Sequence, residues 1–190
     1  MKRYIGFFFA FLILLPSALS AEPTTRDVRA AIQRGDNQTI NTMIKDKVDF
    51  IALQNKGNKS DLSALELAVY FRKHDILTKL VSYQPALVEH FGTNALKLAC
   101  STNKQDKTAI ELLVTSGVNI NTSNSAGQNC LYSAAVAVDV DFFEYLITLG
   151  ANPKAKITPH KWLNIEGPIT VEAFLQIRLK RHQAMLDSIQ

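Results

Sequence analysis

Few side chains in this chain of 190 residues are placed for catalysis or metal binding. None of the four histidines has a histidine, cysteine or aspartate at the spacing of a metal site; they are His74, His90, His160 and His182. Cys100 with His90 as its general base is the one nucleophile pair to consider. Cys100, however, falls at a helix position that the sequence pattern predicts to be buried, and buried thiols are usually inert.

Motifs of other common chemistries are also missing from the sequence. It contains neither a glycine-rich phosphate loop nor a G-x-S-x-G nucleophile motif. No two acidic residues stand apart in an apolar surrounding, so no general acid and base can be assigned. We therefore expect a protein that is not an enzyme and that holds no cofactor and no metal.

A short apolar phrase recurs four times and indicates the architecture. Each copy has an apolar residue, an alanine three positions later and then a small or apolar residue; the copies begin at Val28, Leu65, Leu96 and Leu131. They are 37, 31 and 35 residues apart, close to the period of about 33 residues of one class of helical repeat. A second apolar stripe follows each copy, which predicts a helix, a turn and another helix in every unit. Such units must stack to bury their apolar faces.

Capping residues support the same division. Ser63 and Glu66 have the spacing of a capping box, and Asn94 and Asn129 stand at the equivalent position of the next two units. We therefore expect the first helices of these units to begin directly after Ser63, Asn94 and Asn129.

With these residues the chain resembles ankyrin repeat proteins over residues 25–157. The segments GQNCLYSAA at 127–135 and LVTSGVNIN at 113–121 are similar to the family phrases G-x-T-P-L-H-x-A-A and L-L-x-x-G-A-x-x-N. The Thr-Pro pair of the family is absent, and another helical-hairpin solenoid is the alternative.

The resemblance implies an all-α fold, an ankyrin-type helical-hairpin solenoid of about four repeats within residues 22–157. The expected repeats span about 25–58, 59–91, 92–125 and 126–157.

Residues 158–190 are expected to form a C-terminal capping segment. After an irregular stretch, Thr170 begins a helix whose apolar side closes the stack; this side consists of Val171, Phe174, Leu175, Leu179, Leu186 and Ile189. We expect Trp162 to pack beneath this helix, since tryptophan is largely buried in most proteins. A role as a binding anchor is the alternative for Trp162.

Residues 1–21 have the order of a secretory signal peptide. Lys2 and Arg3 precede an apolar run at 5–16, and small residues follow it. The run is shorter than the roughly 20 residues of a membrane-spanning helix, so we expect cleavage after Ser20 or Ala21 in preference to a retained anchor. The mature chain is then expected in the periplasm as one domain, without stable membrane insertion.

The only two cysteines, Cys100 and Cys130, could pair in such a compartment. They fall in neighbouring units, whose helices stack about 10 Å apart, whereas a disulfide needs Cα atoms within about 7 Å. We therefore expect two buried thiols.

Positive and negative charges are interspersed along the chain. The 21 Lys and Arg residues nearly balance the 17 Asp and Glu residues, and no basic stripe of the kind that binds nucleic acid is seen. We therefore expect a protein partner, no nucleic acid, and a monomer when the partner is absent.

In ankyrin repeat proteins, partners bind the turns between repeats and the inner face of the first helices, and the resemblance implies a site there. The exposed turn tips are expected at 56–61, 89–92 and 123–128. The candidate partner-binding residues are Lys56, Asn58, Lys59, Asp61, Glu89, His90, Phe91, Asn124, Ser125 and Gln128. Phe91 is the best single anchor, because aromatic residues are over-represented among binding hot spots, unless its ring folds back onto the stack.

These observations favour a non-catalytic periplasmic binding module. Within that class they favour an inhibitor of immunity type, which binds and neutralises a toxic effector protein. Two alternatives stay open: an accessory protein that supports a periplasmic catalase or resistance to oxidative stress, and an envelope scaffold whose basic edge at 178–181 meets anionic surfaces.

Overall fold

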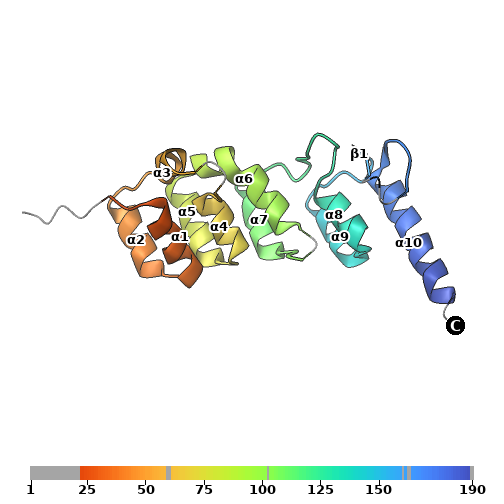
Figure 1. The fold of residues 1–190 in the computed structure, drawn as a ribbon, viewed down its shortest axis with the longest axis horizontal. Helices are drawn as coiled ribbons and strands as arrows, with labels where there is room; N and C mark the ends of the chain where they lie inside the picture. The colour runs from red at the N-terminus through yellow and green to blue at the C-terminus, as the bar shows by residue number, and fades with distance from the viewer. Residues whose placement is uncertain (1–21, 59–60, 102, 160, 162–163, 189–190) are drawn as a thin grey trace, which may run out of the picture.

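The computed structural model describes residues 22–188, apart from 59–60, 102, 160 and 162–163 (Figure 1). The described helices are α1 (Thr25–Arg34), α2 (Asn37–Lys45), α3 (Phe50–Lys56), α4 (Ala64–Tyr70), α5 (His74–Tyr83), α6 (Ala86–Ala99), α7 (Lys107–Thr115), α8 (Cys130–Ala137), α9 (Val140–Thr148) and α10 (Val171–Asp187). Two short antiparallel strands, β1 (Lys156–Ile157) and β2 (Ile169–Thr170), pair before the last helix. The leader, Lys59, Trp162 and Ile189 lie outside the described residues.

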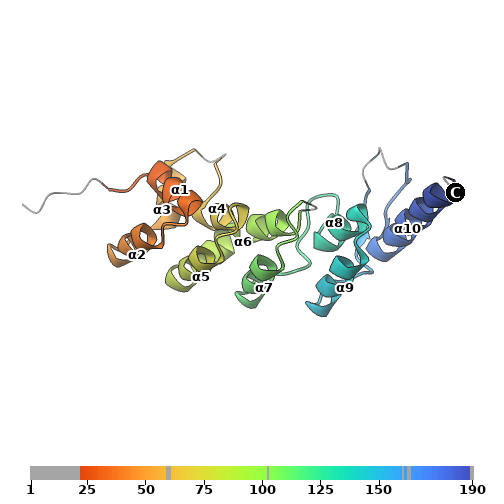
Figure 2. The same ribbon diagram turned by 90° about the horizontal axis from the view of Figure 1, so that it is seen from below.

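The helices stand in two rows (Figure 2). One row contains α1, α4, α6 and α8, and each of these is followed by its partner in the other row, α2, α5, α7 or α9. The two helices of every pair pack against each other, and α10 continues the first row next to α8. The expected all-α solenoid of four helix pairs with a C-terminal capping helix is therefore confirmed.

Side-chain caps fix where two of the predicted helices begin. The Ser63 hydroxyl accepts a hydrogen bond from the Glu66 N–H at 3.3 Å, and the Glu66 carboxylate accepts one from the Ser63 N–H at 2.8 Å. The Asn129 side chain accepts a hydrogen bond from the Tyr132 N–H at 3.1 Å at the start of α8. Each such cap contributes about 1 kcal/mol of stability.

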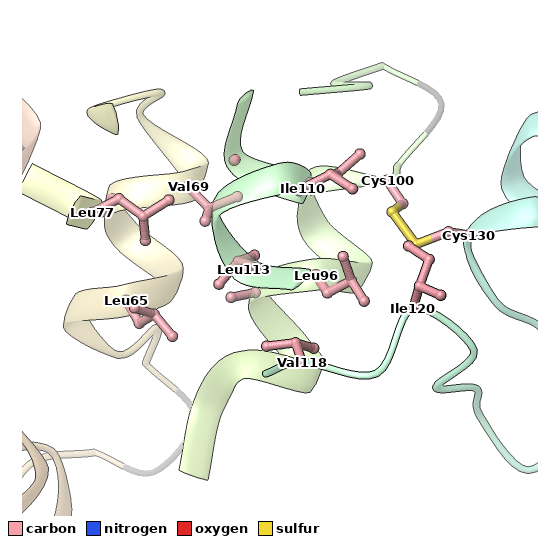
Figure 3. Close-up of a cluster of buried hydrophobic side chains, with 14 of the residues drawn as sticks. Leu65, Val69, Leu77, Leu96, Cys100, Ile110, Leu113, Val118, Ile120 and Cys130 are labelled. Atoms are coloured by element: carbon pink, nitrogen blue, oxygen red, sulfur yellow. A yellow bond between two sulfur atoms is a disulfide. The ribbon is translucent and has the colours of Figure 1, made fainter. Parts of the chain in front are cut away.

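Alanine at the recurring position lets the first helices approach one another closely. Ala31, Ala68, Ala99 and Ala134 are all 0 % exposed. Larger side chains there would force the helices apart. Leucine and isoleucine side chains from both rows pack around these alanines in one core, of which Figure 3 shows the central part.

The connection between the second and third helix pairs is helical, which corrects the turn expected at 89–92. α6 runs without a break from Ala86 to Ala99, so Asn94 is an interior residue and not a cap. Pro85 enters the helix with φ −55° and ψ −30°, which suits a helix start. Gly92 lets α6 pass close to Val118, because a Cβ at this position would stand only 2.6 Å from the Val118 Cγ2.

The short helix α3 follows the first helix pair and was not predicted from the sequence. Asp49 caps it by accepting hydrogen bonds from the N–H groups of Ile51 and Ala52, both at 3.0 Å. The Gln84 side chain fixes this cap, because it donates to Asp49 at 2.8 Å and accepts from the Phe50 N–H at 3.1 Å. The exposed turn expected at 56–61 therefore begins at Lys56, the last residue of α3.

The third and fourth helix pairs are joined differently from the others. α4 packs closely on both α1 and α6, whereas in the described chain the backbones of α6 and α8, and those of α7 and α9, lie further apart. Figure 1 shows the wider spacing at this junction. Contacts other than close packing of helix backbones must therefore bridge this junction.

A disulfide between Cys100 and Cys130 crosses this junction (Figure 3). The two Cα atoms are 5.2 Å apart and both side chains are buried. The expectation of two free thiols was therefore wrong. It assumed the spacing of helices packed side by side, but Cys100 is the C-cap of α6 and Cys130 is the first residue of α8. The two helix ends therefore come closer together than the bodies of the two helices do.

Polar contacts accompany the disulfide. The Tyr145 hydroxyl of α9 lies 3.1 Å from the Lys107 carbonyl oxygen and 3.0 Å from Oε1 of Glu111, both on α7. Burial, and after it the Glu111 carboxylate, raises the pKa of Tyr145 well above its ordinary value, so the phenol keeps the proton that it donates. On the other side, Asn121 accepts a hydrogen bond from the Asn152 N–H at 2.7 Å.

The last helix closes the stack, as predicted. Thr170 caps α10, and the ring of Phe174 stacks on the ring of Tyr132 in α8 with centroids 5.1 Å apart. The buried residues of this helix are Val171, Phe174 and Leu175. Leu186 is 39 % exposed, so the prediction that it lies on the buried side of this helix was wrong. The final turns of α10 extend past α8 (Figure 1), which leaves Leu186 without a helix to pack on.

Replacing both Cys100 and Cys130 with serine is expected to lower the free energy of unfolding by about 3–4 kcal/mol, because the disulfide restricts the unfolded chain. The bridged residues are 30 positions apart. Urea unfolding followed by circular dichroism measures the change. Dithiothreitol should shift the midpoint of the wild type and leave that of the serine variant unchanged. Equal midpoints with and without the bridge would show that the remaining contacts hold the junction alone.

Candidate functional site

Most of the residues predicted to bind a partner lie along one long edge of the stack, which we call the tip edge. It consists of the end of α3 with residues 57, 58 and 61, the N-terminal half of α6, and the loop at 123–128, all on the upper side in Figure 1. The structure thus brings segments from three parts of the sequence to the same side. Lys59 lies outside the described residues.

The loop at 123–128 is held in shape by its own side chains. Asn124 Oδ1 accepts hydrogen bonds from the N–H groups of Ala126 at 2.9 Å and Gln128 at 3.0 Å. The Gln128 side chain donates to the Thr158 carbonyl at 3.0 Å. Asn124 and Gln128 therefore shape the loop, and both Asn124 and Ser125 are exposed at its tip.

Gly127 joins this loop to the segment that follows α9. Its φ is +74°, and a Cβ there would overlap the carbonyl oxygen of Lys156. Beside it, the Thr158 N–H donates to the Ala126 carbonyl at 2.8 Å. Only glycine combines this φ with so close an approach. The loop is thus backed by residues 156–158 and is not a free tip.

The middle of the tip edge is a helix surface and not a turn. Glu89 and His90 are exposed on α6, as expected of binding residues. Phe91 is half-buried, packs against the core and has its ring centroid 6.0 Å from that of His90. Phe91 therefore offers only part of its ring to a partner. Neighbouring His90 has no role as a base for Cys100, because the Cys100 sulfur is bonded to Cys130.

The N-terminal end of the tip edge carries exposed charges. Lys56 Nζ lies 3.7 Å from a carboxylate oxygen of Glu22, and because both side chains are largely exposed this pair contributes little stability. Asn58 and Asp61 are also exposed. Asp61 differs from the others because it borders a cavity.

This cavity has a volume of about 220 Å³ and opens between α1, α3 and the segment that leads into α4. Its floor is apolar and consists of Val28, Phe50, Leu53, Leu62 and Leu67. Its rim is polar, with Arg26 and Arg29 from α1, Gln54 from α3, and Asp61. We call it the α1–α3 cavity.

Sequence reasoning missed the α1–α3 cavity because it had no place for α3. A signal was available: Asp49 directly precedes the apolar run at 50–53, which is the pattern of an N-cap followed by a helix. Arg26 and Arg29 are three positions apart, so a helix places them on one face. What the sequence does not contain is the placement of α3 opposite α1, which makes these residues the lining of one cavity.

The tip edge and the α1–α3 cavity offer charges, hydrogen-bond donors and an apolar hollow, which can make polar and apolar contacts with a binding partner. In the part of the chain that the structure describes, no group of three or more His, Cys, Asp or Glu side chains is arranged to hold a metal ion. A search of the same residues finds no helix whose length and apolarity would let it cross a bilayer.

Gly127→Ala is expected to destabilise the protein by about 1–3 kcal/mol more than Gly167→Ala, because its new methyl group must displace the Lys156 carbonyl. Both glycines have φ +74°, but nothing lies within 4 Å of a Cβ on Gly167. The difference between the two variants in urea unfolding therefore isolates the contact that backs the loop. Equal losses would mean that this contact does not hold it.

The Ala52 N–H, and after it the Gln84 amide, hold the pKa of the Asp49 carboxyl below its ordinary value of 3.8. A carboxyl with a lowered pKa stabilises the fold above the ordinary value, and this contribution is lost as pH falls through the pKa of the folded state. Asp49→Asn keeps an accepting oxygen and does not titrate. Between about pH 5 and pH 2, unfolding midpoints should fall further for the wild type than for this variant. Parallel pH curves would contradict the role of Asp49 as a charged cap.

Residues 65–157 match the sequence model of ankyrin repeats, in three copies. The matched residues run from α4 to β1, and α1, α2 and α3 precede them. No curated protein matches the sequence. Ankyrin repeats indicate a protein–protein interaction module. Since the matched repeats and the preceding helix pair form one stack, the chain belongs to the ankyrin repeat family.

Proposed function

We propose that this chain is a non-catalytic binding module that acts outside the cytosol, in the periplasm. The observation that carries the proposal is the buried disulfide between Cys100 and Cys130, which uses both cysteines of the chain. Disulfides persist in oxidising compartments and are rare in the cytosol. The order of residues 1–21, with basic residues, an apolar run and then small residues, points to the same compartment.

A stiff tip edge supports a binding role for this surface. Asn124 and Gly127 hold the loop at 123–128 in one conformation, and α6 carries Glu89 and His90 on a helix. A surface that is ordered before binding loses little conformational entropy when the partner arrives. This property suits a protein that binds one partner tightly.

Within this class we propose an inhibitor of immunity type, which binds a toxic effector protein delivered into the periplasm and blocks its action. Such an inhibitor needs a complementary surface and no chemistry of its own. The tip edge presents charges of both signs, with Lys56 at the end of α3, Asp61 in the segment that follows it and Glu89 on α6, all three exposed. Charges arranged in this way contribute specificity and a fast encounter.

Export is tested on the full chain, produced with its leader in a Gram-negative host. Protein from the periplasm is expected to begin at residue 21 or 22. After denaturation it should resist alkylation by iodoacetamide until a reductant is added, because both thiols are bonded to each other. A chain that keeps its leader, or that is alkylated after denaturation alone, would contradict the periplasmic proposal.

The inhibitor role is tested by deleting the gene and growing the deletion strain against its parent. The deletion strain should be outcompeted, and the wild-type gene should restore survival. A gene with Glu144→Lys, an exposed change on α9 away from the tip edge, should also restore survival. The combined changes Lys56→Glu and Glu89→Lys should not. Equal survival of deletion strain and parent would refute the inhibitor role. If the deletion strain instead lost resistance to peroxide, the result would favour the alternative function, an accessory protein that supports a periplasmic catalase.

A further inference from the structure

We infer that the α1–α3 cavity is an anchor site for one bulky apolar side chain of a partner protein that has an acidic residue beside it. The inference rests on the proposed binding function, and it names the chemistry that the partner must present at this point of the stack.

The size of the cavity selects a side chain and excludes larger ligands. An apolar cavity of about 150 Å³ accommodates a benzene ring, whereas pockets for cofactors and drug-sized ligands measure about 300–1,000 Å³. The α1–α3 cavity measures about 220 Å³. Its floor is apolar, and Val28, Phe50 and Leu67 in it are buried in the core. A phenylalanine or leucine side chain matches both the size and the polarity.

The rim of the cavity supplies positive charge that no ion pair within the described chain engages. Arg26 and Arg29 lie on one face of α1, and neither guanidinium group has an ion pair among the described residues. The neighbouring carboxylate of Asp27 is occupied by the N–H and hydroxyl groups of Thr24, at 2.8 and 2.7 Å. Two uncommitted guanidinium groups beside an apolar hollow are suited to a carboxylate.

The walls of the cavity are formed before any partner arrives. The Gln54 side chain of α3 donates a hydrogen bond to the Asp61 carbonyl at 2.8 Å, which holds the opposite wall against the helix. Asp49 and Gln84 fix the start of α3 in the same manner. A rigid hollow of this kind is where binding hot spots occur in protein interfaces.

The cavity is a feature of this chain and not of its repeats in general. α3 ends at Lys56, before residue 65, where the match to the ankyrin repeat model begins. An anionic lipid surface is a poorer occupant, because the Asp61 carboxylate on the rim would repel it and because a flat surface does not reach the apolar floor.

The probe for this site is a short acetylated, fluorescein-labelled peptide with one phenylalanine between glutamates. Matched peptides carry alanine in place of phenylalanine, or lysines in place of the glutamates. Fluorescence anisotropy with the purified chain should show binding of the first peptide at least about tenfold tighter than of either matched peptide, because both the anchor and the charge contribute.

Reversing the charge of the two arginines on the rim provides a second test of the anchor site. The combined variant Arg26→Glu and Arg29→Glu should weaken binding of the phenylalanine peptide by at least about tenfold. The variant Arg34→Glu and Lys45→Glu changes the net charge equally at exposed positions that do not line the cavity, and should bind as the wild type does. Circular dichroism checks that both variants are folded, which is expected because Arg26, Arg34 and Lys45 are exposed and Arg29 is half-buried on the cavity rim.

Three results would overturn the inference. They are equal binding of the alanine peptide, equal weakening in the Arg34 and Lys45 control, and binding of phosphatidylglycerol vesicles with no binding of any peptide. The survival experiment is independent of these. If the deletion strain survives while the peptide binds as stated, the inhibitor role fails and the anchor site stands.

Discussion

The disulfide between Cys100 and Cys130 covalently joins the third and fourth helix pairs, at a junction where the helix backbones lie further apart than those of α1, α4 and α6 do. In a repeat protein each unit contacts only its neighbours, so the position of every later unit depends on the interface before it. Buried alanines let α1, α4 and α6 pack closely, whereas in the described chain the backbones of α6 and α8 lie further apart. The bridge, together with Tyr145 and Asn121, therefore sets where α8, α9 and α10 stand. It also sets the distance between the α1–α3 cavity and the loop at 123–128, which lie on opposite sides of the junction.

Sequence patterns predicted the fold where the signals are local and repeated. Ser63 and Asn129 begin their helices as expected, because a cap depends on a few adjacent residues. Asn94 carries the same signal and does not cap, because Pro85 starts the helix earlier and the residues after it continue it through Gly92. The disulfide was missed for another reason: a uniform spacing between units was assumed, and this spacing does not hold at the one junction where Cys100 and Cys130 meet.

The candidate site was predictable in outline and not in detail. The repeat pattern indicates which segments reach the tip edge, but it does not indicate whether a polar side chain there is free or already bonded within the protein. Asn124 and Gln128 are bonded internally, and Ser125 beside them is exposed. The α1–α3 cavity depends on contacts between residues far apart in the sequence, such as Phe50 with Gln84, and a pattern read along the chain does not contain them.

Because α6 is one unbroken helix, the directions of its exposed side chains are fixed relative to those of its buried side chains. Its N-terminal half displays Glu89 and His90, and its C-terminal half buries Ala95, Leu96 and Ala99. Successive residues of an α-helix turn by about 100°, so one inserted or deleted residue between the two halves would swing the displayed side chains to a different face while the buried ones stay fixed. A change in length inside α6 would therefore alter the displayed surface more than a substitution at a single exposed position would.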